Sequence, residues 1–217
     1  MKSQDIGLLL KLVALRSIEG HDPDTHPGKG ARVLRDDWRD WALDDADIDL
    51  PEESLPVLHQ DPMLARYSVR ALAKETGISK SQVSLALQRC MQVGLARKDR
   101  RINVPRANLR ALFNFIAHGV RYVFPAKPGE ITRGIATTFA APVLEGQLYS
   151  AGELPMVWPD ARGNSKGQAI DPLFKSVPYA VRRDRDLYAM LALVDAIRVG
   201  HPRESKLAAE RLAAYLE

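Results

Sequence analysis

Residues 68–90 read SVRALAKETGISKSQVSLALQRC, and this stretch decides the fold of the chain. Ser68 and Ser79 are of the residue type that caps the start of helices, because a serine hydroxyl accepts a hydrogen bond from a free backbone N–H. Gly77 lies between them, and glycine adopts a left-handed backbone at little cost. The pattern therefore predicts two helices joined by a turn at Gly77, the second of which spans residues 80–93.

A basic hairpin is predicted after the second helix. Residues 95–97 and 101–104 are expected to pair as two short strands, with Lys98, Asp99 and Arg100 at the tip between them. Pro105 is expected to end this unit, and a further helix is predicted over residues 108–119.

This arrangement resembles the winged helix-turn-helix of MarR-like bacterial transcriptional regulators. The chain as a whole resembles uncharacterised bacterial winged-helix regulators. That family has a small residue on the first helix, a glycine in the turn and a β-branched residue in the second helix, which match Ala73, Gly77 and Val83. The resemblance covers residues 68–104 and, more loosely, a helix with one apolar side predicted over residues 3–18. The side chains expected to fill the space between the paired helices are Leu72, Ile78, Val83 and Leu87.

The resemblance implies a sequence-specific reader of double-stranded DNA, with residues 80–93 in the major groove. The residues that it places toward base edges or phosphates are Lys80, Ser81, Gln82, Ser84, Leu85, Gln88 and Arg89. Hairpin residues of the wing at 96–104 are expected on the phosphate backbone or in the minor groove, namely Lys98, Arg100 and Arg101. Arg70 and Lys74, on the first helix, are expected to add phosphate contacts. The alternative for some of these side chains is an ordinary surface charge.

Charge is distributed unevenly along the chain. Residues 66–110 carry eleven bases and two acids, whereas residues 19–65 carry four bases and thirteen acids, within a chain of net charge +4. The basic block coincides with the predicted helix pair, which favours a phosphate-facing surface over a merely solvated one. The acidic segment, in which residues 31–43 suit a helix, is interpreted first as an insertion packed beside the domain. Two alternatives are an arm used in dimer exchange and an acidic strip that competes with DNA.

The second half of the chain differs from the first in its content of proline and glycine. Proline and glycine are frequent between residues 125 and 178, which favours short strands and loops. The elements predicted in this half are strands at 122–124 and 134–141 and helices at 184–199 and 203–216. We therefore expect an α+β protein, mostly helical, with a winged helix at 1–118 and a mixed module at 119–217. The two closing helices are the expected dimer contact, with packing inside one chain as the alternative.

No motif in the chain indicates catalysis, a cofactor or a metal ion, so none of the three is expected. The chain has no run of eighteen apolar residues and a single cysteine, Cys90, so a cytoplasmic protein is expected. Cys90 is interpreted as a buried structural thiol rather than a redox sensor. A loop is predicted over residues 157–167. One hypothesis is that Trp158 and Asp160 of this loop line a ligand pocket together with Arg121, Tyr122, Arg133 and Arg162. Alternatively, Trp158 is core and Asp160 makes a local turn bond.

Three functional hypotheses follow from the sequence. The first is a homodimeric transcriptional regulator, expected to be a repressor, that binds a defined DNA operator. The second is an antitoxin-like or defence-system interaction protein, in which the C-terminal module binds a partner protein and the winged helix autoregulates. The third is a nucleic-acid-directed enzyme with its site in residues 120–180, against which stands the lack of a clustered nucleophile and base.

Overall fold

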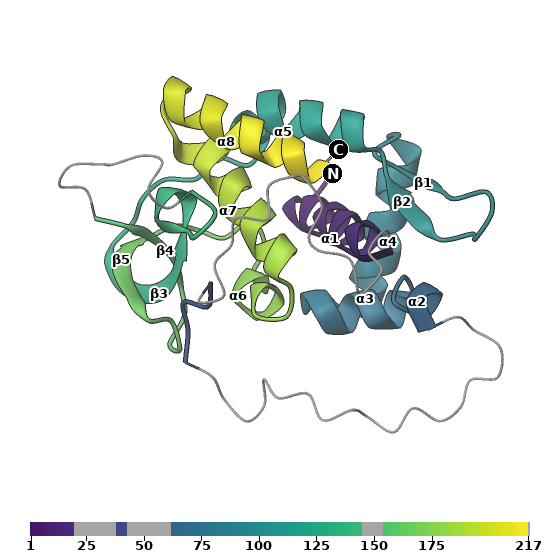
Figure 1. Cartoon of the computed structure of the whole chain (residues 1–217), viewed down its shortest axis with the longest axis horizontal. Helices are drawn as coiled ribbons and strands as arrows, with labels where there is room; N and C mark the ends of the chain where they lie inside the picture. The colour runs from purple at the N-terminus through teal and green to yellow at the C-terminus, as the bar shows by residue number, and fades with distance from the viewer. Residues whose placement is uncertain (20–37, 43–61, 145–153, 217) are drawn as a thin grey trace.

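The computed structural model describes residues 1–19, 38–42, 62–144 and 154–216, and it shows an α+β protein in which helices dominate over small sheets (Figure 1). Most of the predicted acidic segment lies outside these residues. Residues 38–42, the described end of the helix predicted over 31–43, are not helical, and Trp41 instead forms a bridge with Gly163. No helix in the described part of the chain has both the length and the apolar character needed to cross a membrane.

The helices and strands have the following bounds. The helices are α1 (Ser3–Glu19), α2 (Pro62–Ala65), α3 (Val69–Thr76), α4 (Lys80–Gln92), α5 (Leu109–Val123), α6 (Val177–Val181), α7 (Arg185–Val199) and α8 (Pro202–Leu216). The strands are β1 (Ala96–Lys98), β2 (Pro105–Ala107), β3 (Ile131–Thr137), β4 (Met156–Pro159) and β5 (Ser165–Ala169), and a 3₁₀ turn, η2 (Thr138–Ala140), follows β3.

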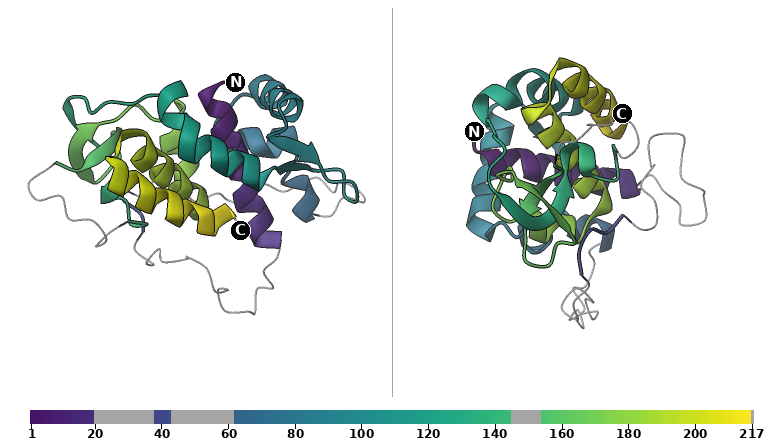
Figure 2. Two further views of the ribbon diagram at one scale, coloured as in Figure 1. Left: turned by 90° about the horizontal axis from the view of Figure 1, so that it is seen from above. Right: turned by 90° about the vertical axis from the view of Figure 1, so that its left-hand side faces the viewer.

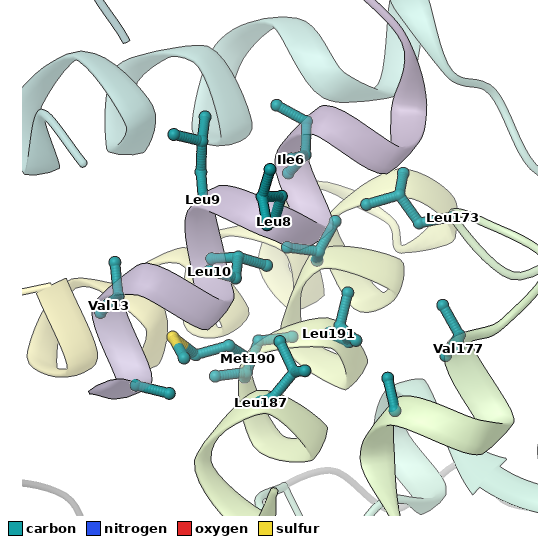
Figure 3. Packing of buried hydrophobic residues seen from close by; sticks show 14 of the residues in the cluster. Ile6, Leu8, Leu9, Leu10, Val13, Leu173, Val177, Leu187, Met190 and Leu191 are labelled. Carbon is teal, nitrogen blue, oxygen red and sulfur yellow. The ribbon is translucent and has the colours of Figure 1, made fainter. Parts of the chain in front are cut away.

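Helix α1 runs through the middle of the molecule, between the α3–α4 pair and the α7–α8 pair (Figure 2). All eleven residues from Asp5 to Leu15 are buried. Leu10 lies toward Met190 of α7 (Figure 3), and Leu8 and Leu187 belong to the same buried cluster. A helix that is buried all round is a core helix, so the expectation of a single apolar side was too narrow.

The two charged residues in the buried part of α1 are both paired. Asp5 is fully buried and accepts hydrogen bonds of 3.0 and 2.6 Å from Nε and Nη2 of Arg89 on α4. Lys11 donates to Glu75 of α3 at 3.1 Å and to Asp184, just before α7, at 2.8 Å. Buried charges are tolerated only with such partners, so these pairs fix α1 against α3, α4 and α7.

The core continues across the boundary predicted at residue 118. That residue lies inside α5, which packs against α7 and α8. Because α1 also contacts α7, one hydrophobic cluster extends through both predicted parts of the chain. The two regions therefore share a core.

Strands β3, β4 and β5 close into a small ring at the end of the molecule opposite the β1–β2 hairpin (Figure 1). Strand β3 pairs antiparallel with β4 and β5, and β4 and β5 pair parallel. The strand predicted at 134–141 is present as β3, which begins three residues earlier than predicted and is followed by η2. The strand predicted at 122–124 is wrong, because Phe124 N–H donates to Val120 O at 2.8 Å and continues the pattern of α5.

The two closing helices are confirmed, and they differ in burial. The carboxylate of Asp184 caps α7 by accepting from Leu187 N–H at 2.9 Å, and every residue from Leu187 to Arg198 is buried. Helix α7 is thus core, which was the alternative to a dimer contact. Helix α8 buries one face and keeps an exposed outer face.

Replacing Leu10 with alanine should lower the free energy of unfolding by about 2–5 kcal/mol, because the lost methyl groups leave a cavity between α1 and α7. Urea denaturation followed by circular dichroism measures this change. Ile18→Ala, at the 40% exposed end of the same helix, is the control and should change stability by no more than about 0.5 kcal/mol. Equal losses in the two variants would contradict the central position of α1.

Candidate nucleic-acid interface

Helices α3 and α4 are capped and joined as predicted. Ser68 Oγ accepts from Ala71 N–H at 3.1 Å, and Ser79 Oγ accepts from Gln82 N–H at 3.4 Å. Gly77 has a φ of 68°, in the left-handed region that favours glycine. The residues expected between the helices are there, since Leu72, Ile78 and Val83 are buried and Leu87 is partly buried.

One face of α4 is exposed to solvent. Its exposed side chains recur at intervals of three or four residues, which places them on one side of the helix, and they are Lys80, Ser81, Ser84, Leu85, Gln88 and, at the end of the helix, Gln92. The opposite side buries Val83, Ala86 and Cys90 against the core. The exposed face therefore combines a cation, hydroxyls, an amide and the apolar Leu85, which is 45% exposed.

Two residues predicted on that face lie elsewhere. The side chain of Arg89 is only 25% exposed and its guanidinium pairs with the buried carboxylate of Asp5, so Arg89 is not the free cation that was predicted on this face. Gln82 is partly buried, and its Oε1 accepts from Gln4 Nε2 at 3.1 Å and from Lys2 Nζ at 3.5 Å. A buried carboxylate without a partner is costly, which explains why Arg89 turns inward. Both residues attach α4 to α1.

The hairpin after α4 is confirmed, with a shifted second strand. Strand β1 pairs with β2 so that Lys98 lies opposite Pro105, four residues beyond the predicted start of the second strand. Pro105 therefore opens β2 rather than ending the unit, a position that suits a residue without N–H. The carboxylate of Asp99 holds the tip by accepting from the N–H groups of Arg101 at 2.9 Å and Ile102 at 3.4 Å.

The hairpin carries exposed cations, as expected. Lys98, Arg100 and Arg101 are exposed, and so is Arg97, which we did not predict as a site residue. A hollow between the hairpin and the end of α1 is lined by Arg16, Arg97, Lys98, Asp99, Arg100, Arg101 and Arg106. Arg16 is more than fifty residues away in sequence from the helix pair, and only the packing of α1 on β2 reveals its place there.

Arg106 fastens the hairpin to the end of α1. It donates to Glu19 at 2.9 and 2.6 Å and to the hydroxyl of Tyr67 at 2.7 Å, and its guanidinium lies 4.8 Å from the centre of the Tyr67 ring. Burial favours a raised pKa for Glu19. Hydrogen bonds with Arg106 and Tyr67, together with the charge of Arg106, outweigh burial and lower the pKa of Glu19.

The first helix of the pair carries the two other predicted cations. Arg70 and Lys74 are exposed on α3, as expected. The hydroxyl of Tyr179, on α6, donates to the backbone carbonyl of Lys74 at 2.8 Å. Helix α3 is thereby held by the C-terminal half of the chain.

The segment 157–167 is not the single loop that was predicted, because it contains the end of β4 and the start of β5, and it serves the core, as in the alternative interpretation. Trp158 is fully buried, and its Nε1 donates to Asp195 at 2.6 Å. Asp160 accepts from Arg162 N–H at 2.8 Å and pairs with Arg182. Among the residues that the structure describes, no group of three His, Cys, Asp or Glu side chains could hold a metal ion.

Gly77→Ala should destabilise the protein more than Gly94→Ala. Both glycines have positive φ, at 68° and 76°, so each substitution costs about 1–2 kcal/mol in backbone strain. A Cβ at Gly77 would also lie 2.8 Å from Cβ of Ser176, whereas a Cβ at Gly94 would meet no atom within 4 Å. Urea denaturation compares the two, and equal losses would contradict the close contact between this turn and the segment before α6.

Cys90 should be unreactive in the folded protein. The thiol is fully buried, and this burial raises its pKa to about 12, so very little reactive thiolate exists at pH 8. We expect a disulfide reagent that releases a coloured thiol to modify the native chain at least about 100-fold more slowly than the urea-unfolded chain. Fast modification of the native protein would restore the redox-sensor hypothesis.

Comparison with known proteins found no matching family model, curated protein or solved structure, so the resemblance to MarR-like regulators stays a prediction that depends on the residues and geometry above.

Proposed function

We propose that this protein binds double-stranded DNA through a winged helix-turn-helix formed by α3, α4 and the β1–β2 hairpin, and that it regulates transcription. The observation that carries the proposal is that α4 presents an exposed and mostly polar face to solvent, while a hairpin of exposed cations follows closely after it. Base readout and phosphate binding need these two surfaces side by side.

The exposed face of α4 suits the edges of base pairs. An α-helix fits the major groove, which is about 12 Å wide. Gln88 carries the amide that pairs with adenine, Lys80 is a donor for guanine or phosphate, and Leu85 can contact a thymine methyl group. Ser81 and Ser84 add hydroxyls that donate or accept.

Gln82 and Arg89 have a different part in this proposal. Their side chains are engaged with α1, so they set the angle of α4 on the protein rather than touching DNA. This leaves Lys80, Ser81, Ser84, Leu85 and Gln88 as the reading residues. Lys98, Arg100 and Arg101 then bind phosphates without regard to sequence.

The proposed regulator acts as a homodimer. Two copies would read two half-sites about one turn of DNA apart. The outer face of α8 is the part of the closing helices that a second copy can reach, since α7 is buried in the core.

Lys80→Ala combined with Gln88→Ala should abolish sequence preference without unfolding the protein, because both side chains are exposed. A preferred duplex is first selected from genomic fragments with the purified wild type. The affinity ratio between this duplex and a scrambled one should then fall at least about tenfold in the double variant, since a bidentate base contact contributes about 1–3 kcal/mol of discrimination. Competition fluorescence anisotropy measures the ratio, and thermal melting checks folding.

Asn114→Ala, an exposed amide on α5, is the matched control and should keep the wild-type ratio. If the double variant discriminates as well as the wild type, α4 does not read DNA. If the wild type binds no duplex at all, the proposed function itself is wrong.

A further inference from the structure

The hollow between the hairpin and the end of α1 concentrates positive charge at one place. We call it the Arg16 hollow, and its lining residues are Arg16, Arg97, Lys98, Asp99, Arg100, Arg101 and Arg106. They come from two segments, since Arg16 belongs to the last turn of α1 and the others to the hairpin. A concave cationic surface built from separate segments is a feature that only the folded chain possesses.

The acidic groups near the hollow are already engaged. The carboxylate of Asp99 accepts two backbone N–H groups of the hairpin tip and lies 3.6 Å from Nε of Arg106. The carboxylate of Glu19 takes both of its close hydrogen bonds from Arg106. Arg106 is thus the cation that these two acids neutralise.

The other cations of the hollow form no close ion pair, although the charge of Arg16 helps to lower the pKa of Glu19. Within the part of the chain that the structure describes, no ion pair involves Arg16, Arg97, Lys98, Arg100 or Arg101. Arg16, Arg100 and Arg101 are also exposed. Like charges gathered in a hollow repel one another and attract a polyanion, so the arrangement is favourable when phosphate groups enter it.

The position of Arg16 is fixed by the same contact that holds the hairpin. Glu19 is one turn after Arg16 on α1, so the two side chains lie on neighbouring parts of the helix surface. Because Glu19 binds Arg106 of β2, the last turn of α1 is held against the hairpin and Arg16 faces the same hollow as Arg97 and Lys98.

We propose that the Arg16 hollow binds a phosphate of the DNA backbone next to the groove occupied by α4, with Arg16 as a phosphate ligand contributed by α1. This inference rests on the proposed function. The first hairpin residue of the hollow, Arg97, comes five residues after the end of α4 at Gln92, so we expect a duplex on α4 to run past the hollow. A guanidinium suits this role because its paired N–H groups match two phosphate oxygens.

Arg16→Ala tests the inference directly. Duplex affinity is measured by fluorescence anisotropy over a series of KCl concentrations. Loss of one phosphate contact should reduce the slope of log K against log [KCl] by about 0.9, which corresponds to roughly fivefold weaker binding at 0.15 M KCl. The loss should be equal for the selected and the scrambled duplex, because a phosphate contact reads no sequence. Arg16→Lys should recover most of the slope.

Arg203→Ala is the matched control. This arginine is exposed on the first turn of α8 and is not among the residues that line the Arg16 hollow. Its removal takes away the same charge from the chain and should leave the slope unchanged. Equal slopes for Arg16→Ala and the wild type would overturn the inference while the proposed function stands.

A second measurement separates a DNA phosphate from a free one. Tripolyphosphate is titrated against the wild type and Arg16→Ala by calorimetry. If Arg16→Ala loses tripolyphosphate binding but keeps wild-type duplex binding, the hollow is a site for free polyphosphate and the inference is wrong. If the wild type binds no duplex, the proposed function has failed as well.

Discussion

The burial of α1 is the constraint on which the rest of this structure depends. A helix with eleven consecutive buried residues needs neighbours on every side, and it finds them in α3, α4, α5, α7 and β2. Its two buried charges add direction to this packing, because each must lie beside a particular partner. Asp5 selects Arg89, and Lys11 selects Glu75 and Asp184. The N-terminal helix thereby joins the two halves of the chain.

These pairs also decide which side of α4 faces outward. Arg89 and Gln82 turn toward α1, so the opposite face, with Lys80, Ser84 and Gln88, is the one left to solvent. Burying part of this charge pair costs desolvation energy, but the pair holds α4 in a single orientation on the core. The proposed DNA-reading surface thus depends on a contact that itself touches no DNA. Helix α3 is held in the same way from α6, through Tyr179.

The cations of this region also fall into two groups, those that hold elements together and those that stay exposed. Arg89 and Arg106 form ion pairs that hold elements together. The exposed cations on the hairpin form no such pair in the described chain, and they are Arg97, Lys98, Arg100 and Arg101. A count of basic residues in the segment 66–110 treats all of them alike. Their partners in the fold separate structural cations from those that can attract a polyanion, and they add Arg16 from a distant part of the chain.

What the sequence by itself determined is local. The serine caps, the turn at Gly77, the spacing of Leu72, Val83 and Leu87, the hairpin and the two closing helices depend on interactions between residues close in the chain, so their pattern is legible without coordinates. Only the tertiary structure decided the rest: the shared core, the buried α7, the inward turn of Arg89 and the place of Arg16. Each of these features depends on partners that lie far away in the sequence. A charged side chain can reach either solvent or a buried opposite charge, and the local sequence does not indicate which of the two it will contact.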